Sequence, residues 1–183
     1  MKENDELMIA ERLEGRAASS LVLPTDPVAG ETLLFETPEG EPAWRLSTSA
    51  GTPGEIESGT AGTWALCRLL GDDGERPAEA DWAMIIAYAV PEAELEELDA
   101  WYVDEHIDML LRCPDWLRTR RYEILQSVNA DWNRLVVHSL ASPRVLESPE
   151  VRESMATPWR QSFASRSWFL TGGRDPVRLV TDP

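Results

Sequence analysis

The chain has 183 residues, of which 43% are hydrophobic and 27% charged, with a formal net charge of −16. This length favours one domain or two small lobes, and this composition is sufficient for a buried core under a soluble surface. The excess of acidic residues argues against nucleic acids and anionic membranes as partners, because proteins bind both through Lys and Arg.

The cysteines and the N-terminus indicate where the protein resides. Cys67 and Cys113 lie far apart and show no CxxC spacing, which argues against a disulfide framework or a zinc site. The first residues lack the basic segment and apolar core of a secretion signal. The longest apolar run, residues 83–90, is too short to cross a bilayer. We therefore expect a cytoplasmic protein.

Residues 1–76 are rich in Gly, Pro, Glu and Thr and show weak periodicity. Apolar residues at helical spacing predict a helix over residues 5–20. Two short apolar runs, residues 33–37 and 43–47, flank a segment with two prolines and a glycine, and this pattern predicts a hairpin.

Residues 63–70 predict a third strand, and residues 71–77 have the composition of a linker. We interpret residues 1–76 as a degenerate half-repeat, an N-terminal lobe that contributes strands to a pseudo-barrel.

Residues 80–174 alternate strand and helix signals more regularly, and residues 175–183 are interpreted as a C-terminal tail. Pro91 followed by acidic residues is typical of a helix start. Ser148 and Thr157, each followed by proline, are typical N-caps. The predicted elements are a strand at 83–90, a helix at 92–111, strands at 118–125 and 134–140, a helical region from 148 that restarts at 157, and a strand at 168–170.

This order, β-α-β-β-α-β, predicts an α+β, ferredoxin-like domain, in which an antiparallel sheet carries both helices on one face. The other face of such a sheet is apolar and must be covered. A second copy in a homodimer would cover it, and so would the N-terminal lobe in an internal pseudo-dimer.

His106 is the first candidate for chemistry. At 100° per residue, its helix has one apolar arc that contains Leu95, Leu98, Tyr102, His106, Met109 and Leu110. The imidazole would therefore face the sheet, where desolvation keeps it neutral and competent as a general base near pH 7. The alternative is a core histidine that is hydrogen-bonded to a backbone carbonyl or to Glu105.

The second histidine, His138, lies on the predicted strand 134–140. It joins His106 in a cleft if its face of the strand points to the helices, and is structural if that face points away. Two histidines with one carboxylate would satisfy a non-haem metal, but no HxH or HxxxH spacing brings two ligands together. Phosphate-binding glycine loops and GxSxG elbows are absent from the sequence. We therefore predict neither a metal nor a cofactor.

Arg120 and Tyr122 share one face of the predicted strand 118–125, and Arg121 lies on the other. An arginine there could hold a carboxylate, phenolate or enolate of a substrate. The alternative is pairing with surface acids, of which the chain has many.

Residues 101–116, WYVDEHIDMLLRCPDW, resemble the WY-(D/N)-x-EH-(I/L)-P-x-LL-x-x-P-G-(F/W) segment of the dimeric α/β-barrel superfamily, in members close to the EthD-like proteins. Asp108 and Asp115 depart from this pattern, which usually has proline and glycine there. The resemblance covers residues 82–174. Further matches lie at residues 120–122, 135–140, 141–146 and 157–159.

The resemblance implies a cleft between helices and sheet, with His106 near its centre. The superfamily includes cofactor-independent monooxygenases, polyketide cyclases, lactone isomerases, dehydratases, decarboxylases and haem enzymes, so membership alone fixes no reaction.

These observations predict a cofactor-independent enzyme that uses histidine acid–base catalysis on a small aromatic or polyketide-like metabolite. A cofactor-free monooxygenase and a non-catalytic small-molecule-binding module are the alternatives. His106 would move a proton, with Tyr102 or Glu105 orienting it. The predicted substrate-binding residues are Trp101, Met109, Tyr88, Trp116, Tyr122, His138 and Arg120.

Overall fold

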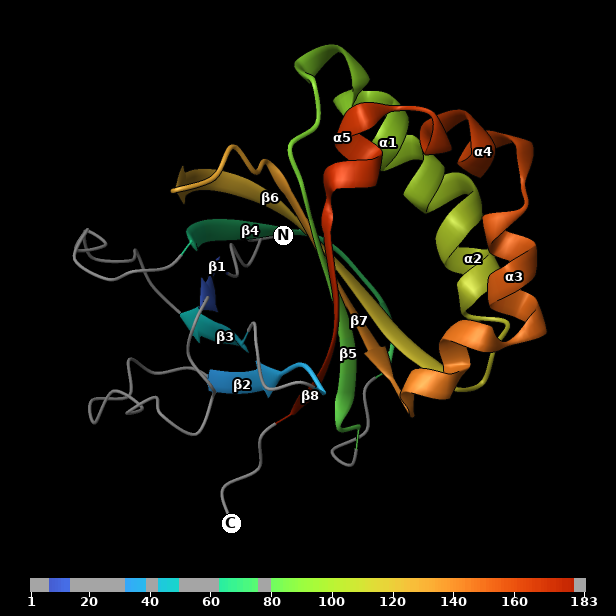
Figure 1. The fold of residues 1–183 in the computed structure, drawn as a ribbon, viewed down its shortest axis with the longest axis horizontal. Helices are drawn as coiled ribbons and strands as arrows, with labels where there is room; N and C mark the ends of the chain where they lie inside the picture. The colour runs from blue at the N-terminus through green and yellow to red at the C-terminus, as the bar shows by residue number, and fades with distance from the viewer. Residues whose placement is uncertain (1–6, 14–31, 39–42, 50–62, 76–79, 180–183) are drawn as a thin grey trace, which may run out of the picture.

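The computed structural model describes residues 7–13, 32–38, 43–49, 63–75 and 80–179. The strands among them form a closed barrel in which every neighbouring pair is antiparallel, in the order β1-β3-β2-β8-β5-β7-β6-β4 (Figure 1). The strands are β1 Leu7–Leu13, β2 Thr32–Glu36, β3 Ala43–Ser49, β4 Thr63–Gly74, β5 Trp82–Tyr88, β6 Trp116–Val128, β7 Arg134–Leu140 and β8 Gly173–Leu179.

The helices of the described chain lie together on one side of the barrel (Figure 1). They occupy the two connections β5–β6 and β7–β8, which confirms the predicted β-α-β-β-α-β order of the C-terminal half. The helical segments are η2 Glu92–Glu94, α1 Leu95–Trp101, η3 Tyr102–His106, α2 Ile107–Leu110, η4 Pro143–Glu147, α3 Pro149–Met155, α4 Pro158–Ala164 and α5 Ser167–Thr171.

The two halves of the barrel have the same strand order. The C-terminal strands run β8-β5-β7-β6 and the N-terminal strands run β4-β1-β3-β2, so each half follows the order fourth, first, third, second. The halves join where β4 pairs with β6 and where β2 pairs with β8. The predicted hairpin at 33–37 and 43–47 is confirmed as the β2–β3 pair.

The sheet separates two cores. Along β5, Ala83, Ile85 and Ala87 face the barrel interior, whereas Met84, Ile86 and Tyr88 face the helices. Because both faces of this strand are buried, its sequence is an almost continuous apolar run rather than an alternating one. We call the core between the helices and the sheet the helix–sheet layer, and the core inside the strands the barrel interior.

Local sequence fixes the later helices. The Ser148 hydroxyl accepts a hydrogen bond from the Val151 amide at 3.2 Å, and the Thr157 hydroxyl accepts one from the Arg160 amide at 3.1 Å. A proline follows each cap, at a helix position whose N–H needs no partner. Both predicted helix starts are therefore confirmed. Among the described residues, no helix combines the length and apolar character that crossing a bilayer requires.

The predicted helix over residues 5–20 is wrong for the part that the structure describes. Residues 7–13 form β1, which pairs with β3 on one side and β4 on the other. Met8 and Ala10 both point into the barrel interior, as alternate residues of a strand do. The apolar run is too short to distinguish this period of two from helical spacing. Pairing within the closed barrel makes this segment a strand. Residues 14–20 lie outside the described residues.

Two boundaries near the C-terminus and the linker also differ from prediction. Residues 168–170 belong to helix α5, where Trp168 and Phe169 are buried while Leu170 is 62% exposed. The fourth strand is β8, so the predicted tail at 175–183 is strand as far as residue 179. Residues 71–74 of the predicted linker extend β4, past an irregularity in its pairing with β6 between Leu69 and Gly71.

Candidate functional site

A π-helical turn, η3, interrupts the first helix at the residues that the sequence singled out. The Ile107 amide donates to the Tyr102 carbonyl, five residues back, as a π turn requires. Residues five apart on an α-helix project about 140° apart. The wider turn brings Trp101 and His106 to the same side, where their rings stack with centroids 4.0 Å apart. Such turns occur frequently at functional sites.

The same turn explains why Met109 does not join the site. The helical wheel assumed 100° per residue throughout, which placed Met109 beside His106. The extra residue in the π turn shifts the register, so Ile107 and Leu110 are buried whereas Met109 is only partly buried. Met109 is absent from the helix–sheet layer as the described residues define it.

His106 is held in the helix–sheet layer with 4% of its surface exposed. Its ring centroid lies 5.5 Å from that of Tyr102. Burial, followed by the nearby His138 and the charge of Arg160, lowers the pKa of His106 well below its usual 6.5. The imidazole is therefore neutral at pH 7.

The Nδ1 atom of His106 is buried and has no hydrogen-bond partner among the described residues. Leaving a buried polar atom unpaired costs about 1–3 kcal/mol, so such an atom requires an explanation. A ligand or water that hydrogen-bonds to Nδ1 would supply the missing partner.

Glu105 is positioned beside this histidine but does not bind it. Its carboxylate accepts hydrogen bonds from the Trp101 indole at 3.1 Å and from the Thr157 hydroxyl at 2.7 Å. Glu105 thus links the first helix to the N-cap of α4 and fixes the indole on which His106 stacks. Any influence of Glu105 on the orientation of His106 acts through Trp101.

His138 faces the helices, which settles the alternative left open by the sequence. Its Nδ1 lies 2.9 Å from the Thr119 hydroxyl, which also accepts a hydrogen bond from the Trp116 indole at 3.2 Å. The ring centroid of His138 is 6.5 Å from that of Tyr102. Burial lowers the pKa of His138 to about 3, so it too is neutral at pH 7.

Two tyrosine hydroxyls meet in the same layer. The hydroxyl oxygens of Tyr88 and Tyr102 are 3.2 Å apart. Burial raises the pKa of each phenol, for Tyr102 well above 10, so both hydroxyls stay protonated. One hydroxyl donates to the other, which leaves one hydrogen of the pair for another acceptor.

Arg120 and Tyr122 lie on the opposite side of the sheet from His106. Tyr122 is part of the barrel interior, and the Arg120 guanidinium carbon lies 5.4 Å from the Tyr122 ring centroid. Arg120 Nε is also 3.5 Å from Asp72, which supports the alternative of pairing with acids.

The predicted site residues that meet in the helix–sheet layer are Tyr88, Trp101, Tyr102, His106, Trp116 and His138.

Sequence reasoning missed Arg160 and Arg174. Both guanidinium carbons lie over the ring of Phe169, 4.3 Å and 4.7 Å from its centroid. The N-cap at Thr157 already placed Arg160 in the first turn of a helix, but not toward His106. The wrong strand at 168–170 concealed that Arg174 begins the last strand.

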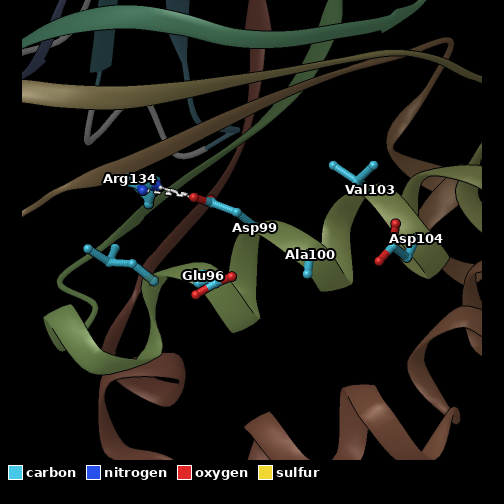
Figure 2. A pocket seen from close by; sticks show the side chains of 7 residues that line it. Glu96, Asp99, Ala100, Val103, Asp104 and Arg134 are labelled. Atoms are coloured by element: carbon cyan, nitrogen blue, oxygen red, sulfur yellow. Dashed lines mark hydrogen bonds and ion pairs between the residues drawn. The ribbon is translucent and has the colours of Figure 1, made fainter.

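A pocket of about 550 Å³ lies on α1 and is lined by none of the predicted site residues (Figure 2). Figure 2 shows Arg134 bound to Asp99, with the acidic side chains of Glu96 and Asp104 along the same helix. Val103, also in its wall, is 53% exposed. This pocket does not coincide with the hollow that was predicted beside His106.

Among the described residues, no group of three or more His, Cys, Asp or Glu side chains could hold a metal ion.

The described chain has a ferredoxin-like fold that it shares with several solved structures. It is similar to an anthrone oxidase-like protein, with a TM-score of 0.72, 8% identity, and coverage of 98% of this chain and 93% of that one. No protein-family model and no curated protein matches the sequence.

Two further solved structures extend this likeness. One is a ferredoxin-fold protein from Listeria monocytogenes related to antibiotic biosynthesis monooxygenases, with a TM-score of 0.61, 12% identity, and coverage of 98% of this chain and 97% of that one. The other is a heme-degrading enzyme from the same organism, with a TM-score of 0.57, 9% identity, and coverage of 94% and 98%. Identities this low show the fold alone.

Proposed function

We propose that the chain is an enzyme for a small aromatic or polyketide-like molecule, with His106 as the general base. The observation that carries this proposal is the unpartnered Nδ1 of a buried, neutral imidazole. In the tautomer that carries its proton on Nε2, this Nδ1 has the free lone pair that proton abstraction requires. The aromatic rings of Trp101 and Tyr102 around it suit a flat substrate.

Isomerisation, cyclisation and dehydration share a first step. An acidic C–H or O–H of the substrate gives its proton to Nδ1 of His106, and the electron pair moves onto the substrate oxygen as an enolate or phenolate. The hydrogen left over by the Tyr88–Tyr102 hydroxyl pair can be donated to that oxygen. Return of the proton to another carbon completes an isomerisation. Attack of the enolate carbon on a carbonyl carbon, whose oxygen takes up the proton, completes a cyclisation, and loss of hydroxide, which takes up the proton and leaves as water, completes a dehydration. In a decarboxylation the carboxylic acid gives its proton to Nδ1, the carboxylate leaves as CO₂, and His106 returns the proton to the carbanion.

A cofactor-free oxygenase is the second candidate, favoured by the likeness in fold to the anthrone oxidase-like and monooxygenase-related proteins. In this reaction the same anion transfers electrons to O₂. For an anthrone, the balanced outcome is one anthrone and one O₂ giving one anthraquinone and one water. Neither candidate assigns a role to a cofactor. Kinship with the EthD-like proteins remains part of the proposal and is supported by residues 101–116.

We further propose that residues 1–76 are a degenerate copy of the C-terminal half and that the chain is an internal pseudo-dimer. The shared strand order of the two halves supports this. In a ferredoxin-like homodimer a second copy covers the free face of the sheet, whereas here the N-terminal strands cover it. We therefore expect a monomer of 20.5 kDa by light scattering.

His106→Phe tests the catalytic proposal, because it preserves a flat ring on Trp101 but removes both ring nitrogens. With anthrone as the probe, O₂ uptake and, without O₂, exchange of the acidic anthrone hydrogens for deuterium from D₂O should fall by about 100-fold or more, the usual effect of losing a general base. His106→Asn, which restores one polar atom without a basic nitrogen, should be equally slow. Wild-type rates in both folded variants would overturn the proposal, and an inactive wild-type chain would remove the anthrone oxygenase candidate.

A further inference from the structure

Two arginines from different elements, α4 and β8, lie over one aromatic ring. The guanidinium carbon of Arg160, on α4, is 4.3 Å from the centroid of Phe169, and that of Arg174, on β8, is 4.7 Å from it. Arg174 also donates to the Phe169 carbonyl at 2.7 Å. The Arg160 side chain is half-buried and that of Arg174 is exposed, so the pair lies between the layer and solvent.

Neither guanidinium lies within ion-pair distance of a carboxylate in the described part of the chain. Arg166, nearby in sequence, contrasts with them because it contacts Glu94 and Glu97, each at 2.7 Å. The whole chain has 33 acidic residues against 17 Lys and Arg. Two adjacent guanidinium groups without an acid are therefore a local exception to the charge of the molecule.

The electrostatics agree with this geometry. Burial, followed by the charge of Arg174, lowers the pKa of Arg160 below its usual value. The charge of Arg160 also acts on His106, Tyr88 and Tyr102. The cationic pair therefore lies within electrostatic reach of the proposed catalytic group. An anion between the two guanidinium groups would relieve their repulsion.

We propose that Arg160 and Arg174 bind the carboxylate of a small aromatic acid. A guanidinium presents a planar fork of donors that matches a carboxylate in bidentate geometry. The buried Phe169 ring, stacked on Tyr88, supports both guanidinium groups. The aryl group of the acid can stack on a guanidinium plane, as aromatic rings do on arginine. This inference rests on the proposed function, since it names the substrate class, but binding can be measured without turnover.

Calorimetric titration of the full chain tests the site, with benzoate, 2-naphthoate and 9-anthroate as probes and the corresponding carboxamides as uncharged controls. We expect the acids to bind at least tenfold more tightly than their amides. Arg160→Gln and Arg174→Gln should each weaken binding of the acids at least tenfold, which is the usual effect of losing a charge-assisted hydrogen bond.

Matched controls separate the site from the general charge of the surface. Arg178→Gln on the same strand and Arg152→Gln on α3 remove exposed charges of the same sign and should change affinity less than twofold. Equal weakening in these controls, equal binding of acids and amides, or no binding of any acid to the wild-type chain at millimolar concentration would overturn the inference.

The two proposals can fail separately. His106→Phe should keep the affinity for the acids, because the ring nitrogens do not contact the carboxylate. Retained turnover in His106→Phe with lost binding in Arg160→Gln would overturn the catalytic proposal and leave the anion site standing. Lost turnover in His106→Phe with wild-type binding in both arginine variants would do the reverse.

Discussion

The helix–sheet layer and the barrel interior are both buried, but they differ in whether a buried polar group has a hydrogen-bond partner. In the barrel interior, one Asp175 oxygen accepts hydrogen bonds from Arg12 at 2.9 Å and from the Trp44 indole at 2.8 Å. In the layer, His106 keeps an unpartnered ring nitrogen among the described residues. Interior polar groups that are satisfied stabilise a fold, whereas one left open is available to a ligand. This difference is why we propose the site in the layer.

We expect the loss of a polar contact to lower the free energy of unfolding more in the barrel interior than in the helix–sheet layer. Asp175→Ala removes the carboxylate that accepts hydrogen bonds from both Arg12 and the Trp44 indole at part-buried positions. We expect the free energy of unfolding to fall by about 3 kcal/mol, measured by urea denaturation. Asp108→Ala, an exposed acid on α2, is the control and should change stability by less than about 0.5 kcal/mol. Equal effects of the two changes would contradict a stabilising role for the Asp175 contacts in the barrel interior.

Low pH should destabilise the protein because the two buried histidines of the helix–sheet layer resist protonation in the folded state. His138 is neutral when folded, with a pKa of about 3, but takes up a proton near pH 6.5 when unfolded. Its contribution to stability is therefore complete above pH 6.5 and is lost as the pH falls toward 3. Between pH 7 and pH 5 this loss is about 2 kcal/mol, and His106 acts in the same direction.

Urea denaturation of the wild-type chain and of His138→Gln at both pH values isolates this contribution. The variant should lose about 2 kcal/mol less than the wild-type chain between pH 7 and pH 5. Equal losses would mean that His138 is not held neutral by burial.

The smallest expected effect is at Gly172, whose backbone lies close to the Tyr88 ring. A Cβ atom on Gly172 would lie 2.9 Å from a ring carbon of Tyr88 and 3.1 Å from the Ala87 carbonyl oxygen. Gly172→Ala should therefore displace the Tyr88 ring and cost about 1 kcal/mol. At Gly173 a Cβ would meet nothing within 4 Å, so Gly173→Ala is the matched control and should unfold like the wild-type chain. Thermal unfolding of the two variants measures the difference.

The sequence predicted those elements whose signals are local. Residues 134–140 were predicted as a strand and coincide with β7, and the N-caps at Ser148 and Thr157 are where they were expected. Both signals depend only on neighbouring residues. Residues 7–13 carry a local pattern compatible with helix, and only their pairing with β3 and β4 makes them a strand.

The sequence predicted only those parts of the site that a regular α-helix would also produce. Tyr102 and His106 face the sheet as the wheel predicted, whereas Met109 does not, because a π turn is invisible to a calculation at 100° per residue. Arg160 and Arg174 could not be found, because their meeting over Phe169 depends on how α4 and β8 pack.

The central claim is that His106 is a neutral imidazole with a nitrogen open to a ligand, and ¹⁵N NMR of the two histidines tests it most directly. His106→Phe assigns the signals. We expect a His106 ring that is neutral at pH 7, does not titrate near 6.5, and has an unprotonated Nδ1 that accepts no hydrogen bond in the free protein. A ring that titrates near 6.5, or an Nδ1 that carries the ring proton, would contradict the claim.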